Sequence, residues 1–164
     1  MRMLRTATRL FVGATGLLAL GAAASVFRDP LYPTHVLYTG TTSLAGTRST
    51  AALIGRLYAV WLLTSGSVRV VTALRYRSVA CRLLSAVSYG IAFAHFYTEV
   101  FWYRTVALHP AGRLPLLVAA TSLVLLILDA IVTVSFRTRG GKRGEASPPV
   151  RESGRTPKPR RLAE

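Results

Sequence analysis

The chain has 164 residues, 51% of them hydrophobic, and carries 21 lysines and arginines against six acids, which gives a formal net charge of +15. Its single cysteine, Cys81, excludes an internal disulfide and a cysteine metal cluster. Such a basic balance can indicate nucleic-acid binding, but these cations lie at the ends of apolar runs and in one tail, as in membrane proteins. We therefore expect a membrane partner and no nucleic acid.

The first predicted element is the apolar run 10–27, which follows a basic N-terminal tail at 1–9. Its 18 uncharged residues are long enough to span a bilayer, so we favour a retained membrane helix. A signal peptide with a cleavage site at the alanines 22–24, or a mitochondrial presequence, is the alternative interpretation. Small residues suited to close helix contact recur along the run at helical spacing: Gly16, Ala19 and Ala23.

Further apolar runs that predict membrane helices are 51–71, 79–103 and 114–136. The long loop 28–50 precedes them, and in it Tyr38 is placed to lie at the membrane surface. Pro115 opens the last run, at a position where a helix tolerates proline. A second stripe of small residues follows one face of the third run: Ala86, Gly90, Ala94 and Thr98.

Residues 137–164 are rich in Gly, Pro, Ser and Arg, which predicts a disordered tail. The sequence thus predicts an all-α protein, a four-helix transmembrane bundle over 10–136 with a disordered basic C-terminal tail.

With four spans, both tails and the second connection share one side and carry 15 cations against four on the other. The positive-inside rule then places both termini in the cytosol. The tail itself either solubilises and orients the chain or grips anionic lipid headgroups.

Two titratable side chains interrupt the third run. Glu99 follows His95 by four residues, so the two share one helix face. A carboxylate in lipid needs a partner. A hairpin of the second and third runs would bring Arg56 level with this pair, so Arg56 is the predicted partner of Glu99.

The fourth run carries one charge, Asp129. The candidate partners are Arg82, near the start of the third run, and Arg69, at the end of the second. Their expected depths in the membrane differ from that of Asp129 by about 10 Å, at roughly 1.5 Å per helical residue. The sequence therefore leaves the partner of Asp129 open.

His95 and Glu99 have the residue types of a proton relay or of a metal site. A metal centre needs more ligands, however, and the other histidines, His35 and His109, fall in loops on the far side. No Ser-His-Asp set lies within plausible reach, and Cys81 has no histidine near it in the sequence. We therefore expect no catalytic residue, no metal and no cofactor.

Four stretches together resemble the ergosterol biosynthetic protein 28 family, small endoplasmic-reticulum membrane scaffolds of sterol synthesis. The stretches are Phe27-Arg28-Asp29, Leu37-Tyr38-Thr39-Gly40, the block from Arg56 through Trp61 and Ser65 to Arg69, and His95-Phe96-Tyr97-Thr98-Glu99 with Tyr103 and Thr105. Order and spacing agree over roughly 4–131. The chain departs from the family pattern at 57–59 and at Arg104, where the family often has a small residue. The candidates for structural or partner contacts are Arg28, Asp29, Tyr38, Arg56, Trp61, Ser65, Arg69, His95, Glu99 and Tyr103.

The resemblance implies a non-catalytic protein of the endoplasmic-reticulum membrane that tethers sterol C-4 demethylation enzymes. These are the sterol C-4 methyl oxidase, the C-3 sterol dehydrogenase/decarboxylase and the 3-keto sterol reductase, with a sterol C-24 methyltransferase as a further partner. Two alternatives stay open. One is an intramembrane sterol-modifying enzyme such as an isomerase, with Glu99 and His95 as its acid/base pair. The other is a small lipid-binding or transport protein. The sequence also leaves homo-oligomerisation open.

Overall fold

The computed structural model describes residues 2–39, 48–107 and 110–144. This part of the chain is helical and contains no strand. Its helices are α1 (Arg2–Arg28), α2 (Tyr32–Val36), α3 (Arg48–Leu74), α4 (Val79–Phe101) and α5 (Pro110–Gly144). All but the short α2 are long and apolar enough to cross a membrane. The predicted all-α architecture with four membrane helices is therefore confirmed.

The long helices extend beyond most of the predicted runs. α1 begins at Arg2 and so includes nearly all of the predicted N-terminal tail. Pro110 begins α5, and Pro115, which was expected to open this helix, lies inside it. α5 also continues to Gly144, into the stretch predicted as a tail. The rest of that predicted tail lies outside the described residues.

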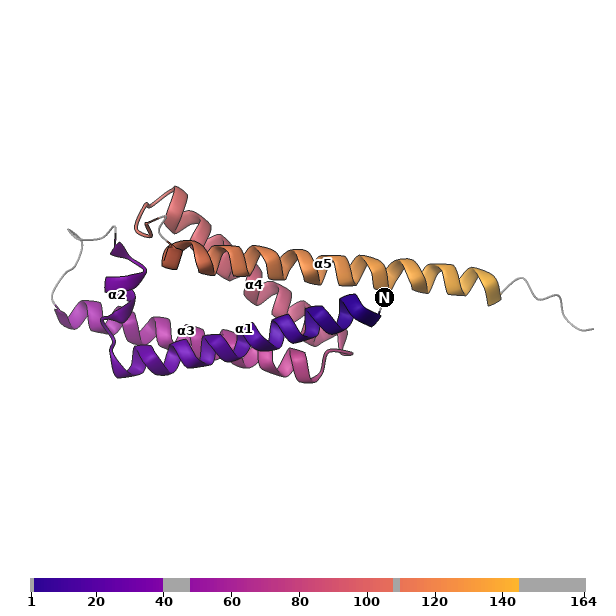
Figure 1. Cartoon of the computed structure of the whole chain (residues 1–164), viewed down its shortest axis with the longest axis horizontal. Helices are drawn as coiled ribbons and strands as arrows, with labels where there is room; N and C mark the ends of the chain where they lie inside the picture. The colour runs from indigo at the N-terminus through magenta and orange to yellow at the C-terminus, as the bar shows by residue number, and fades with distance from the viewer. Residues whose placement is uncertain (1, 40–47, 108–109, 145–164) are drawn as a thin grey trace, which may run out of the picture.

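The helices do not form four parallel columns (Figure 1). α1 lies along α3, while α4 runs obliquely from its turn with α3 towards the start of α5, against which it packs. The N-terminus, the α3–α4 turn and the C-terminal end of α5 lie at one end of the bundle. α2 and the described residues that follow α4 (102–107) lie at the other. Both ends of the described chain therefore share one side, while the cytosolic identity of that side stays a prediction.

α1 and α3 approach closely because glycines face each other. A Cβ on Gly16 would lie 2.9 Å from the Cβ of Arg69, and one on Gly66 would lie 3.0 Å from the carbonyl oxygen of Gly16. Ala19 and Ala23 on the same stripe of α1 are buried. The first small-residue stripe is therefore a helix-packing face, as expected in lipid, where close van der Waals contact replaces the hydrophobic drive.

Only part of the second stripe, on α4, packs within the described bundle, since Ala86 packs against the buried core cluster. Ala94 is exposed, and a Cβ on Gly90 would meet nothing within 4 Å. Within the described chain the prediction that this stripe is a packing face therefore holds at Ala86 and is wrong at Gly90 and Ala94. The buried face of α4 mixes large and small side chains: Ser85, Tyr89, Ala92, Phe96 and Val100.

Gly55 gives a direct test of the packing at the start of α3. A Cβ on Gly55 would lie 1.8 Å from the carbonyl oxygen of Pro30, a backbone atom that cannot rotate away. We expect Gly55→Ala to lower the melting temperature of the purified protein in detergent and its yield from membranes. Gly90→Ala is the matched control on α4, and we expect it to be neutral or to stabilise by up to about 1 kcal/mol through helix propensity. Equal melting of the two variants would contradict the close packing of α3 on Pro30.

Candidate functional site

A chain of polar side chains links α4 to the segments on either side of it. The Tyr38 hydroxyl shares a hydrogen bond of 2.8 Å with Nε2 of His95. Nδ1 of His95 faces Oε1 of Glu99 at 3.8 Å, and Oε2 of Glu99 accepts a hydrogen bond from the Thr105 hydroxyl. We call Tyr38, His95, Glu99 and Thr105 the polar column.

Local turns bring Tyr38 to this place. The Asp29 carboxylate accepts a hydrogen bond of 3.1 Å from the backbone N–H of Leu31, which turns the chain after α1. The carbonyl of Pro33 then accepts the backbone N–H groups of Leu37 and Tyr38, each at 2.9 Å. These bonds end α2 so that the Tyr38 ring lies edge-on to Tyr58 of α3, with ring centroids 6.2 Å apart.

Thr105 reaches Glu99 because the chain reverses just after α4. Arg104 has φ 56°, in the left-handed region that non-glycine residues seldom adopt. The backbone N–H of Thr105 then donates to the carbonyl of Glu99 at 3.0 Å, while its hydroxyl binds the carboxylate of the same residue. Both oxygens of Glu99 therefore face polar groups within the protein.

The proton positions in the polar column follow from its surroundings. Burial raises the pKa of Tyr38 well above its usual range, and the nearby Tyr58 and Glu99 add to this effect. The Tyr38 hydroxyl therefore keeps its proton at neutral pH and can donate it to Nε2 of His95. The other ring nitrogen of His95, Nδ1, faces Glu99.

The predicted pair between Arg56 and Glu99 does not form. Arg56 is exposed, and among the described residues it has no ion pair with a carboxylate. The prediction assumed an upright hairpin of α3 and α4, but α4 leaves α3 obliquely (Figure 1). Tyr38 and Thr105, from the segments before α3 and after α4, take the positions that Arg56 was expected to fill beside His95 and Glu99.

A second polar cluster surrounds Asp129 at the opposite end of the bundle. Asp129 is 3% exposed, and its Oδ2 accepts hydrogen bonds from Nη1 of Arg82 at 2.7 Å and from the Tyr76 hydroxyl at 3.2 Å. Nε of Arg5 lies 3.8 Å from Oδ1. Burial and the neighbouring carboxylate of Asp129 raise the pKa of Tyr76 to about 12, so this hydroxyl remains a donor at neutral pH.

The cluster resolves the open partner of Asp129 in favour of Arg82 and excludes Arg69. The expected difference in depth was misleading, because it assumed upright helices and α4 is oblique. Sequence reasoning missed Tyr76 and Arg5 as partners. The early start of α1 brings Arg5 to the cluster, and a turn residue such as Tyr76 gives no periodic signal.

Arg69 lies elsewhere, at a cavity of about 310 Å³ between the helices. Its guanidinium lies over the ring of Tyr89, 4.1 Å from the ring centroid. Trp61 and Ser65, two other candidates from the same sequence block, also line the cavity. One face of the block from Arg56 to Arg69 therefore lines this cavity, while Arg56 itself is exposed.

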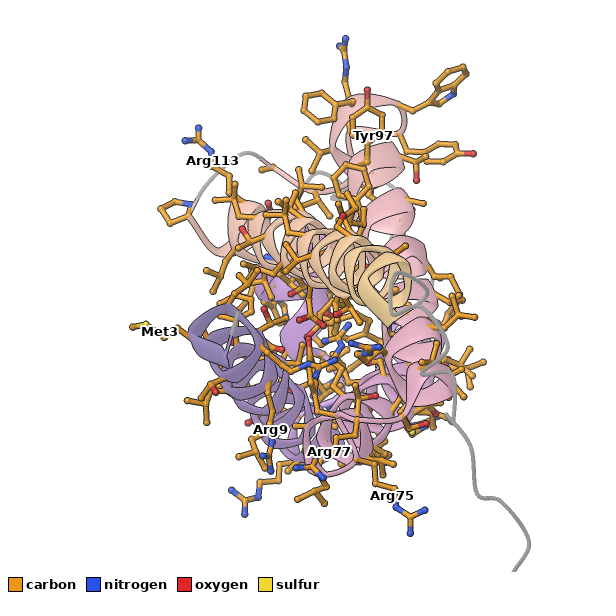
Figure 2. The ribbon with its side chains drawn as sticks, turned by 90° about the vertical axis from the view of Figure 1, so that its right-hand side faces the viewer. Met3, Arg9, Arg75, Arg77, Tyr97 and Arg113 are labelled. Carbon is orange, nitrogen blue, oxygen red and sulfur yellow. The ribbon has the colours of Figure 1, made fainter. Side chains whose placement is uncertain are left out.

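The remaining candidates lie at the surface. Arg28, Asp29 and Tyr103 are exposed, and of these Asp29 has the local role described above. Cations also mark the end of the bundle that carries the N-terminus. Figure 2 shows Arg9, Arg75 and Arg77 projecting from its lower edge. Nε of Arg9 donates to the carbonyl of Ala73 at 2.7 Å, near the end of α3 where a cation is favourable.

The surroundings of His95 and Glu99 limit the chemistry that these side chains can perform. The part of the chain that the structure describes has no group of three or more His, Cys, Asp and Glu side chains able to hold a metal ion. Neither His95 nor Glu99 lines the cavity. The polar column can therefore hold α4 against its neighbours, but it does not present an acid/base pair to a molecule in the cavity.

These features define an all-α, multi-pass membrane protein whose helices are joined by buried polar contacts. The family model described as Erg28 like protein matches residues 8–124, so the chain belongs to this family. Similar proteins include the "Ergosterol biosynthetic protein 28 homolog" of Homo sapiens and of Pongo abelii, both 27% identical, and that of Mus musculus, 26% identical. Each similarity extends over 116 residues, 71% of this chain and 79% of the relative. No solved structure matches the chain.

Asp129 and Arg56 give contrasting tests of the buried charges. We expect Asp129→Ala to destabilise the protein by about 3–5 kcal/mol, because it leaves Arg82 partly buried without its carboxylate. We expect Arg56→Ala to stay within about 0.5 kcal/mol of the parent, since Arg56 is exposed and forms no ion pair in the described structure. Unfolding of the purified proteins in one detergent measures both. A larger loss for Arg56→Ala than for Asp129→Ala would contradict this assignment of partners.

Proposed function

We propose that this protein is a non-catalytic scaffold that holds the enzymes of sterol C-4 demethylation together at the endoplasmic-reticulum membrane. The observation that carries the proposal is the family match over 8–124, with relatives named for ergosterol biosynthesis. Its partners are then a sterol C-4 methyl oxidase, a C-3 sterol dehydrogenase/decarboxylase and a 3-keto sterol reductase. Holding sequential enzymes together raises the concentration of each intermediate at the next enzyme, which is a benefit that needs no chemistry from the scaffold.

The contacts that His95 and Glu99 make support a scaffold over an isomerase. An acid/base pair must come within hydrogen-bond reach of the substrate proton. His95 and Glu99 instead face Tyr38 and Thr105, and they do not line the cavity. The polar column is thus accounted for as the contact that fixes the α2 region and the α4–α5 connection to α4.

The outer face of α4 is the surface that we assign to partner helices. Phe93, Tyr97 and Phe101 form a continuous row, with ring centroids 5.8 Å and 4.9 Å apart. Tyr97 points away from the bundle (Figure 2), and Phe101 is also exposed. A row of preformed aromatic contacts can pack against a partner helix with little loss of side-chain freedom. The unpacked small residues Gly90 and Ala94 on the same helix leave room for close approach.

Orientation follows from the cations. The end of the bundle that carries Arg9, Arg75 and Arg77 faces the cytosol in our proposal, together with both termini, because positive residues are retained on that side. Accessibility of the termini to an impermeant label in sealed microsomes tests this arrangement.

Capture of the tagged full-length protein in mild detergent tests the scaffold role. We expect the three C-4 demethylation enzymes to be recovered with the parent protein. The double change Tyr97→Ala and Phe101→Ala should reduce recovery of at least one enzyme several-fold, because each ring offers a large contact area. Leu83→Ala with Leu84→Ala is the matched control, since these residues are equally exposed near the other end of α4.

Two outcomes would reject the scaffold. In the first, none of the three enzymes is recovered from membranes that contain them all. In the second, the purified protein alone converts a sterol and Glu99→Gln abolishes that conversion, which would establish the isomerase-type alternative.

A further inference from the structure

The cavity between the helices, which is partly open to the outside, has the size and lining of a site for an apolar molecule. Its volume is about 310 Å³, within the range of small-molecule sites. Side chains from α1, α2, α3, α4 and α5 all contribute to its wall. Much of this wall is apolar and includes Leu18, Trp61, Phe96 and Val118. An occupant therefore needs a substantial apolar body.

One cation in this wall has no counter-ion. Arg69 is only 7% exposed, its Nε has no hydrogen-bond partner, and within the described residues it takes part in no ion pair. Among the described residues, no aspartate or glutamate lines the cavity. The described acids are engaged elsewhere: Asp29 with Leu31, Glu99 with Thr105 and His95, and Asp129 with Arg82, Tyr76 and Arg5.

The aromatic contact of Arg69 does not replace a counter-ion. The face of the Tyr89 ring attracts the guanidinium and offsets part of the cost of its burial. The face of a ring, however, does not supply the oxygen acceptors that the N–H donors in the guanidinium plane can bind. A planar fork of donors at the edge of an apolar cavity matches the two oxygens of a carboxylate.

We propose that this cavity binds a lipid carboxylate, with the carboxylate on Arg69 and the apolar body between the helices. Two sources share this chemistry, a sterol carboxylic acid and a fatty acid. The sterol source rests on the proposed function, since an oxidase that acts on a methyl group must pass a carboxylic acid to a decarboxylase. The protein would then hold the intermediate as well as the enzymes that exchange it.

Trp61 provides a built-in reporter. It lines the cavity, while Trp102, the other tryptophan of the chain, is 82% exposed. In a Trp102→Phe background the fluorescence of the purified protein in detergent comes from Trp61. The probes are a synthetic 4-carboxysterol and oleic acid, each titrated beside its own neutral methyl ester.

We expect at least one acid to change the Trp61 fluorescence saturably and to bind about tenfold or more tightly than its ester, as a charge-assisted hydrogen bond would provide. Arg69→Met should remove this preference, while Arg56→Met, on the same helix but outside the cavity, should retain it. Ala22→Phe, which adds a bulky ring at the wall of the cavity, should weaken binding of the acid with Arg69 intact, and Ala24→Phe, outside the cavity on α1, should not. The acid that binds identifies the source.

The comparison of acid and ester needs no substitution, so the proposal stays testable even if Arg69→Met fails to fold. Absence of binding by both acids, or equal binding of acid and ester, would overturn it. Capture of the sterol enzymes with Ala22→Phe separates the two proposals. Normal capture without acid binding would leave the scaffold standing and remove the lipid site.

Discussion

A charged side chain inside this bundle cannot be hydrated by the lipid around it, so its partners must come from other helices. Asp129 shows what this constraint does to the fold. Its carboxylate, on α5, contacts Arg82 on α4, Tyr76 in the α3–α4 turn and Arg5 on α1. One buried acid therefore joins three helices and a turn at the same end of the molecule. Loss of α4 would remove Arg82, the cation nearest to Asp129, and loss of α5 would leave Arg82 without its carboxylate.

The polar column does the same at the other end with weaker charges. Histidine, tyrosine and threonine can satisfy a carboxylate without adding a permanent cation, which lowers the cost of burying the group. The column joins α4 to Tyr38, which follows α2, and to Thr105, which follows α4. The two polar clusters lie towards opposite ends of the oblique α4, and between them the helix packs through its buried face, which includes Tyr89 and Phe96. Polar contacts near its two ends thus fix the direction of α4, and apolar contacts pack the part of the helix between them.

The sequence predicts the number and positions of the membrane helices because the length of an apolar run is a direct consequence of bilayer thickness. It also predicts the packing of α1, since Gly16, Ala19 and Ala23 leave space for the close approach of a neighbouring helix. The pairing of charges is harder to predict. Depth along an assumed upright helix placed Arg56 beside Glu99 and separated Arg82 from Asp129, and the slant of α4 reverses both results. The crossing angle of α4 depends on the volumes of side chains such as Tyr89 and Phe96, which no periodicity encodes.

Arg104 shows how a departure from a family pattern acquires meaning once the backbone is known. The family resemblance places a small residue here, and the observed φ of 56° is a conformation that glycine adopts without steric cost. An arginine in this conformation costs about 1–2 kcal/mol of local strain. The turn nevertheless forms, because it delivers Thr105 to the carboxylate of Glu99. The Glu99 side chain is only 19% exposed, and a largely buried carboxylate left without donors would cost more than this strain, so the need to satisfy Glu99 outweighs the local preference of Arg104. Satisfying a largely buried charge therefore takes precedence over the backbone preference of a single turn residue. This explains why the polar column forms although the turn contains Arg104.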